Sequence, residues 1–243
     1  MMRISVDNKI LEKYPNAEIG YLVALVAVRE TDAFVENLKK DLIEHVKERG
    51  INATNFAIHP KISVWRNIYK NDFHVKETTY RSSIEALVKR SVTGKSLWNI
   101  CNIVDLYNCC SIMSLLPMGG YDIKKISGDI TIRYAQEGEL FHGIGEKLKI
   151  QTKSEHVIYA DNQKVMCWLW NHKDAYETCI DESTKYVLFF IDSVDGFNSN
   201  MVQEALERLS NYLTKIECFP ISSGVLNHAH PCAHVSRMED VVK

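Results

Sequence analysis

Proline is scarce in this chain, and several features that mark particular classes of protein are missing. The 243 residues include five prolines and no stretch rich in proline, glycine or serine, which argues against domains joined by hinged linkers. The longest apolar run, residues 21–28, is too short to span a bilayer, and the amino terminus lacks a signal peptide's apolar segment. We therefore expect a cytoplasmic protein without a membrane partner.

Charge, cysteine spacing and glycine loops exclude further classes. A net charge of −2 provides no general basic field, so no DNA partner is expected and any RNA contact must use a local patch. The seven cysteines are odd in number and include no C-x-x-C pair, which is typical of reduced intracellular thiols. No phosphate-binding glycine loop of the P-loop or dinucleotide type is present, and no cofactor is expected.

The carboxyl-terminal region carries the only run of residues that suggests a metal. In LNHAHPCAHV the alternating residues would point to one side of an extended segment, and all are zinc-ligand types: His228, His230, Cys232 and His234. Their spacing matches no standard structural zinc site, and Pro231 interrupts it. The pattern favours a strand or tail that happens to carry histidines, and no metal is expected.

The remaining composition is that of a globular protein, with 46% apolar and 25% charged residues. We expect one domain over 1–243, with a core of about 20–194 and a carboxyl-terminal helix and tail over 198–243. Periodicity predicts helices at 31–49, 62–69, 82–94 and 201–217, and strands at 20–28, 129–133, 156–160, 164–170 and 186–191. Ser82-x-x-Glu85 forms a capping box. This order predicts an α+β fold with a mainly antiparallel sheet flanked by helices.

Residues 99–122 combine polar groups with apolar surroundings. Asp105 and Asn108 share one helical face within an apolar run, and each needs a hydrogen-bonding partner if it is buried. The following Pro117–Gly120 segment predicts a turn, and Gly119-Gly120 would let backbone approach a ligand. The segment indicates a site for a small molecule or a nucleotide end.

Several motifs, in order, resemble the B3/B4 domain of the phenylalanyl-tRNA synthetase β chain, particularly its free-standing relatives. The resemblance extends from about residue 20 to about residue 194. It rests on WRNIYK (65–70), SSIEALVKR (82–90), NIVDLYN (102–108), LPMGGYD (116–122), GDITIRYAQEGE (128–139), VIYAD (157–161) and WLWNHKD (168–174).

The resemblance implies an editing domain that hydrolyses mischarged aminoacyl-tRNA, acting here in trans because the synthetase core is absent. The family's Asp and Asn match Asp105 and Asn108, whereas its pocket histidine falls on Gly119 and its pocket glutamate near Phe189 or Phe190. Both of these polar groups are therefore missing. Trp168–Asp174 replaces the family's glycine-rich loop.

An aminoacyl ester is labile, so an editing site must mainly position water and stabilise an oxyanion. Backbone amides at Gly119 and Gly120 could stabilise the oxyanion, and Trp168 and Trp170, on one side of a strand, could form an aromatic wall. The expected catalytic residues are Asn108, Gly119, Gly120 and Asp174, and the expected substrate-binding residues are Asp105, Asp122, Trp168, Trp170 and Asn171.

Other interpretations of these residues stay open. Asp105 is also compatible with a structural cap or with a buried partner of Arg66 or Arg90, and the two tryptophans are also compatible with a plain core. The expected partner is the aminoacylated acceptor end of tRNA. The alternatives are a non-catalytic protein that binds an amino acid or an RNA end, and a hydrolase or sensor for another amino-acid ester or amide.

Overall fold

The computed structural model describes residues 1–196 and 200–236. Its α-helices are α1 (Asn8–Lys13), α2 (Ala33–Glu48), α3 (Pro60–Asn71), α4 (Ser83–Val92), α5 (Asn102–Ser114) and α6 (Met201–Lys215). Short 3₁₀ helices are η1 (Phe56–Ile58), η2 (Ile123–Lys125) and η3 (Tyr176–Thr178). The strands are β1 (Met2–Val6), β2 (Glu18–Leu25), β3 (Met118–Asp122), β4 (Ile130–Tyr134), β5 (Leu140–Phe141), β6 (Ile150–Gln151), β7 (Val157–Ala160), β8 (Val165–Trp168), β9 (Lys173–Asp174), β10 (Tyr186–Ser193), β11 (Phe219–Leu226) and β12 (Cys232–Val235).

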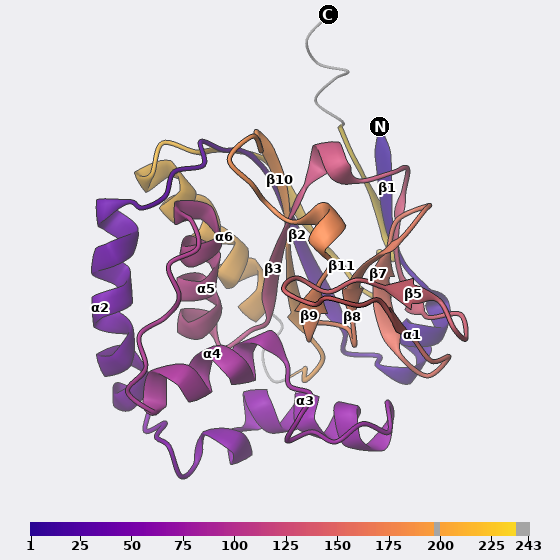
Figure 1. Ribbon diagram of the computed structural model, residues 1–243, viewed down its shortest axis with the longest axis horizontal. Helices are drawn as coiled ribbons and strands as arrows, with labels where there is room; N and C mark the ends of the chain where they lie inside the picture. Colours follow the sequence, from indigo (N-terminus) through magenta and orange to yellow (C-terminus); the bar gives the residue numbers. More distant parts are fainter. Residues whose placement is uncertain (197–199, 237–243) are drawn as a thin grey trace, which may run out of the picture.

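Two sheets form the centre of the molecule (Figure 1). A four-stranded antiparallel sheet has the order β11-β2-β10-β3, and a six-stranded sheet has the order β12-β1-β4-β7-β8-β9. Within the six-stranded sheet, β1 and β4 are parallel and the other neighbours are antiparallel. The predicted α+β class with a mainly antiparallel sheet is confirmed.

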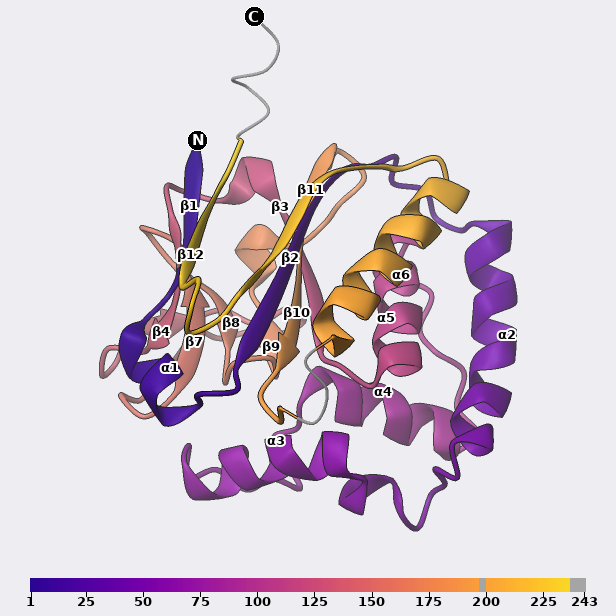
Figure 2. The same ribbon diagram turned by 180° about the vertical axis from the view of Figure 1, so that it is seen from behind.

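The four-stranded sheet lies between helices and the other sheet, as Figures 1 and 2 show from opposite sides. Alternation along its strands explains the layering, because successive side chains point to opposite faces. Leu22 and Phe189 belong to the core under α2, α5 and α6, whereas Val23 and Phe190 belong to the core shared with the six-stranded sheet. A cavity on the second face is therefore bounded by both sheets.

Both ends of the chain contribute strands that the sequence reading did not predict. Met2, Ile4 and Val6 of β1 alternate into the core, and the short α1 is capped by Asp7. The predicted carboxyl-terminal helix is α6, but β11 and β12 then extend the two sheets, and β12 pairs with β1. Strands at both chain ends thus complete sheets whose other strands lie mid-chain.

The predicted turn at Pro117–Gly120 is wrong. The chain reverses earlier, at Leu115, which ends α5 in the left-handed conformation with a φ of 54°. The Ser111 hydroxyl donates a 2.6 Å hydrogen bond to the carbonyl of Leu116 and holds this reversal. Gly119 and Gly120 follow in β3, paired with β10.

Candidate functional site

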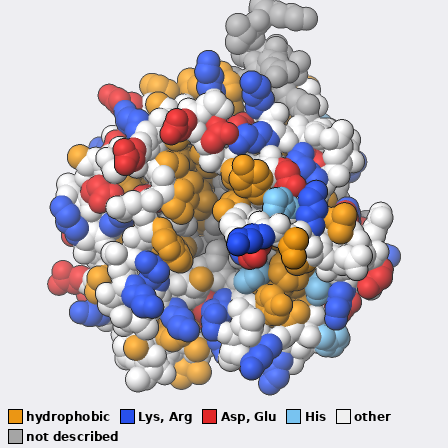
Figure 3. Space-filling model, in the orientation of Figure 1, with side chains coloured by type: hydrophobic (Ala, Val, Ile, Leu, Met, Phe, Trp, Pro, Cys, Tyr) orange, Lys and Arg blue, Asp and Glu red, His pale blue; other side chains and the backbone are white. Residues whose placement is uncertain are grey.

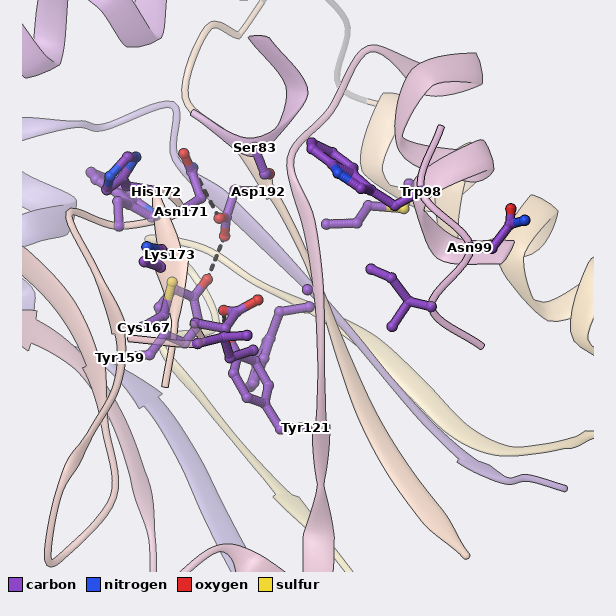
Figure 4. A pocket seen from close by; sticks show the side chains of 17 residues that line it. Ser83, Trp98, Asn99, Tyr121, Tyr159, Cys167, Asn171, His172, Lys173 and Asp192 are labelled. Atoms are coloured by element: carbon purple, nitrogen blue, oxygen red, sulfur yellow. Dashed lines mark hydrogen bonds between the residues drawn. The ribbon is translucent and has the colours of Figure 1, made fainter. Parts of the chain in front are cut away.

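A cavity of about 580 Å³ lies between the two sheets and opens toward the loop that joins α4 to α5. Its volume is within the range of small-molecule sites. Figure 3, in the orientation of Figure 1, shows a hollow near the centre of the face that is turned to the viewer, and Figure 4 shows the lining side chains. They are Ser83, Trp98, Asn99, Ile100, Met118, Gly119, Tyr121, Ile144, Tyr159, Cys167, Trp170, Asn171, His172, Lys173, Asp174, Phe190 and Asp192.

Strand alternation places the β3 and β10 residues on the cavity face. Gly119 and Tyr121 of β3, and Phe190 and Asp192 of β10, are two residues apart and so share a face. A Cβ built on Gly119 would lie 3.6 Å from both carboxylate oxygens of Asp174. The absence of a side chain at Gly119 therefore leaves space beside that carboxylate.

Asp192 supplies a buried carboxylate at one end of the cavity. It is 4% exposed and accepts hydrogen bonds from the Tyr159 hydroxyl and from Asn171 Nδ2, the second at 3.1 Å; Figure 4 draws both. Burial raises the pKa of Asp192 to about 7, although the Tyr159 and Asn171 hydrogen bonds oppose the rise. The indole N–H of Trp170 also lowers this pKa, but its geometry falls short of a hydrogen bond. This carboxyl can exchange a proton near neutral pH.

Asp174 supplies a second carboxylate, from the short strand β9. Its Oδ1 accepts a hydrogen bond of 2.5 Å from the Tyr121 hydroxyl, and β9 pairs Asp174 with Cys167 of β8. Burial raises the pKa of Asp174, and the Tyr121 and Cys167 hydrogen bonds oppose this. The negative charge of Asp174 also raises the pKa of Asp192. Two carboxyl groups thus share one cavity, an arrangement suited to a cationic group or to proton transfer.

Backbone geometry separates the two tryptophans that were expected to lie together. Leu169 and Trp170 both have left-handed conformations, with φ of 53° and 63°, so the strand alternation ends at Trp168. Trp168 lies outside the cavity lining and donates a 3.0 Å hydrogen bond to His156 Nδ1, whereas Trp170 lines the cavity. The predicted common side is wrong because a two-residue left-handed turn replaces the strand.

Other predicted residues also divide between the cavity and elsewhere. Gly119, Asn171 and Asp174 line the cavity, whereas Asp105, Asn108, Gly120 and Asp122 lie outside its lining. Gly120 faces the opposite side of β3, where its Cβ would meet Ile180, Phe189 and Tyr107 at 3.2 Å. The two glycines are adjacent in a strand, and alternation sends them to different faces.

Asp105 and Asp122 have structural partners. Asp105 is 2% exposed, pairs with Lys39 Nζ at 2.5 Å and accepts the Ile100 amide at 3.1 Å. Its partner is therefore neither Arg66 nor Arg90, and Arg66 instead pairs with Glu85 at 2.6 Å. Burial raises the pKa of Asp105 and Lys39 counteracts that rise.

Asp122 caps η2 by accepting the Lys124 amide at 2.9 Å and also accepts the Thr184 hydroxyl at 2.9 Å. Asn108 lies almost one turn beyond Asp105 on α5. A shared helical face at Asp105 and Asn108 thus did not indicate a shared pocket.

Sequence reasoning missed several polar residues of the cavity. Asp192 was detectable as a charged residue inside the apolar strand YVLFFIDS, two positions beyond Phe190. His172 also lines the cavity, and burial lowers its pKa. Tyr121 and Tyr159 gave no sequence signal, because tyrosines in apolar strands are ordinarily core residues.

The cavity mouth combines exposed apolar side chains with positive charge. Trp98, Ile100 and Ile144 are 47%, 56% and 45% exposed, and all three line the cavity. The Arg90 guanidinium lies 4.1 Å from the centre of the Trp98 ring. In Figure 4, Trp98 lies across the cavity from His172.

The histidine-rich tail does not assemble a metal centre within residues 1–196 and 200–236, where no group of three or more potential ligands is close enough to hold an ion. His228 and His230 lie in the β11–β12 connection, and Cys232 and His234 lie in β12. Across the same described ranges, no helix combines the length and apolar character needed to cross a membrane.

A family model described as the B3/4 domain matches residues 68–218, which include α4, α5, β3 and β10 and therefore most of the cavity. The chain belongs to the B3/4 domain family. This confirms the predicted resemblance. The match also includes the carboxyl-terminal helix α6, which the resemblance read from motifs had left out.

Two proteins to which this chain is similar are subunits of phenylalanyl-tRNA synthetase. The phenylalanine–tRNA ligase beta subunit of Chromobacterium violaceum is 31% identical over 90 residues, which are 37% of this chain and 11% of that subunit. A crystal structure of an N-terminal fragment of the phenylalanyl-tRNA synthetase beta subunit from Pyrococcus horikoshii covers 89% of this chain with 12% identity and a TM-score of 0.46; the aligned part is 49% of that fragment. This chain thus spans about a tenth of the curated relative and about half of the crystallised fragment.

Proposed function

We propose that this B3/4 domain hydrolyses the ester bond of mischarged aminoacyl-tRNA, as a trans-editing enzyme. The observation that carries the proposal is an open cavity with two buried or half-buried carboxyl groups, Asp174 and Asp192, next to a basic surface segment. An aminoacyl ester has a cationic amino group, a labile carbonyl and a polyanionic RNA body. The cavity and its surroundings offer a complementary group to each.

The basic segment lies between residues 60 and 95. It contains eight lysines and arginines and three acidic residues, although the whole chain has a net charge of −2. Figure 3 shows many Lys and Arg side chains below the hollow, where Figure 1 draws α3 and α4. Lys70, Lys89 and Lys95 are exposed. Local positive charge of this kind attracts phosphates without a basic protein overall.

The two carboxyl groups have different roles in the proposed reaction. Asp174 binds the amino group of the aminoacyl ester, in the space that Gly119 leaves open. Asp192, with a pKa of about 7, takes a proton from the attacking water, because a general base is most effective when its pKa lies near the ambient pH. The water oxygen bonds to the ester carbonyl carbon, the bond from that carbon to the ribose oxygen breaks, and the proton passes to the ribose oxygen.

A specific observation favours a second candidate, a protein that binds without hydrolysis. Both oxygens of Asp192 already accept hydrogen bonds, one from Tyr159 and one from Asn171. These donors satisfy the carboxylate without a ligand, and a water can be activated only through the lone pair that each oxygen has left. In the second candidate the same cavity holds a free amino acid or an RNA end.

Deacylation distinguishes the two candidates. Purified protein is incubated with correctly and wrongly charged tRNAs, and loss of labelled amino acid is compared with the spontaneous rate. We expect selective acceleration on a mischarged pair, reduced about 100-fold or more in Asp192→Asn. Asp41→Asn, an exposed carboxylate on α2, is the matched control and leaves the rate unchanged. Folded protein that accelerates none of the pairs contradicts the editing proposal, and binding of free amino acids is then measured.

A further inference from the structure

We infer that Trp98, backed by Arg90, is a stacking platform for the terminal nucleobase of the RNA whose 3′ end enters the cavity. The inference rests on the proposed function for the identity of the ligand and adds a base-binding subsite. It assigns Trp98 as a positioning residue, since the ring contacts the base and the reacting ester lies deeper. The site accepts esters of a nucleoside rather than amino-acid esters in general.

The exposure of Trp98 is unusual among the tryptophans of this chain. Trp65, Trp168 and Trp170 are 2%, 8% and 0% exposed, whereas Trp98 is 47% exposed at the mouth of the cavity. Leaving so large an apolar ring in water is unfavourable and marks a contact surface when it adjoins a cavity. Ile100 and Ile144, also about half-exposed, add further apolar surface to the cavity lining.

The Arg90 guanidinium packs on one face of the Trp98 ring and holds the ring in place. The guanidinium lies 4.1 Å from the ring centre, and its Nε donates a 2.5 Å hydrogen bond to the carbonyl of Ser96. One ring face is thus covered by a cation held by the backbone. A base can stack on the side that borders the cavity, and aromatic rings stack any base through its π-face.

The positive charge around the platform favours RNA over a protein partner with an apolar surface. Arg90 belongs to the basic segment of residues 60–95, and Lys89 and Lys95 beside it are exposed. A protein partner docking on Trp98, Ile100 and Ile144 would have to cover this positive charge. An RNA end instead places a base on the ring, its phosphates beside the cations and its aminoacyl group in the cavity.

The test measures binding of an uncharged minihelix RNA, with either a normal 3′-terminal adenosine or an abasic residue at that position. Stacking predicts that the abasic end, and separately Trp98→Ala, each weaken binding by about 5- to 100-fold. If base and ring contact one another, the two changes do not multiply: Trp98→Ala no longer distinguishes the two RNAs. Trp98→Phe restores part of the discrimination.

Phe219→Ala is the matched control, because Phe219 is a 60% exposed aromatic residue on β11, which Figure 2 shows on the opposite side of the molecule. It leaves both affinities unchanged. Trp98→Ala removes an exposed ring, so circular dichroism should confirm that the variant folds.

The outcomes separate this inference from the proposed function. If the protein deacylates tRNA but the affinity losses from Trp98→Ala and from the abasic end multiply, the platform is overturned and editing is left intact. Ring-dependent recognition of the terminal base without deacylation supports the platform and removes the hydrolase. A wild-type protein that binds neither RNA overturns the platform, and the deacylation panel then decides the function separately. A change in amino-acid preference in Trp98→Ala, without loss of base recognition, assigns the ring to the amino-acid side chain instead.

Discussion

Asp192→Asn should change how the stability of this protein depends on pH. The carboxyl is 4% exposed, and its pKa is raised from the ordinary 3.8 to about 7, mainly by burial. Asparagine has nearly the same shape and can keep partners in Tyr159 and Asn171, but it does not titrate. The difference between wild type and variant therefore isolates the cost of ionising this group in the folded state.

The sign and size follow from linkage. A carboxyl with a folded pKa above its unfolded pKa binds more protons in the folded state, so stability falls as pH rises from the unfolded value through the folded one. One pKa unit corresponds to about 1.4 kcal/mol, so ionisation of Asp192 between about pH 5 and pH 8 costs wild type about 3 kcal/mol relative to Asp192→Asn. Asp174, whose charge raises the pKa of Asp192, is present in both proteins.

Urea unfolding at several pH values measures the effect. The free energies of unfolding of wild type and Asp192→Asn should approach one another below about pH 4, diverge progressively between about pH 4 and pH 8, and then run parallel, with the variant more stable. Asp41→Asn, which removes an exposed carboxylate, should run parallel to wild type over the same range. Parallel curves for Asp192→Asn and wild type would refute the raised pKa and the proton-accepting role built on it.

Three further predictions test the cavity, a buried ion pair and the thiols. Gly119→Ala should reduce deacylation, or amino-acid binding, at least about 10-fold, since its Cβ would lie 3.6 Å from both oxygens of Asp174; an unaltered rate would place the substrate elsewhere. Lys39→Met should lower the free energy of unfolding by about 3–5 kcal/mol in a urea titration by leaving Asp105 buried and unpaired, yet activity per folded molecule should persist. Cys232 is the exposed cysteine among the seven, all of which are described, so a thiol reagent should react rapidly with about one equivalent. Cys232→Ser should remove that rapid phase, and a second fast thiol would contradict the lower exposure of the others, of which Cys179 is half-buried and five are buried.

Elements with strong local periodicity were predictable. The segments α2, α4, α6 and β10 lie within a few residues of their predicted ranges, because apolar spacing and caps are local properties. In α4 the Ser82 hydroxyl accepts the Glu85 amide at 3.3 Å, as the capping box predicts. The carboxylate of Glu85 instead binds Arg66, a partner nineteen positions away that no local pattern could indicate.

Strand β1 and the end of β8 show where local reasoning failed. Five residues at the amino terminus become a central strand only because β4 and β12 lie on both sides of them. The left-handed pair Leu169 and Trp170 ends a strand that propensity alone would continue. In both places tertiary contacts outweigh weak local preferences.

The sequence by itself determined the α+β class, the main helices and the family, because these depend on patterns within short segments and on their order. It also placed Gly119, Asn171 and Asp174 among the residues to examine, and all three line the cavity. Only the tertiary structure decided that Asp192 joins them while Asp105 is bound by Lys39. Strands and helices distant in the chain bury both carboxyl groups and so raise the pKa of each, and the same elements decide that Lys39 opposes the rise at Asp105, whereas Tyr159 and Asn171 oppose it at Asp192.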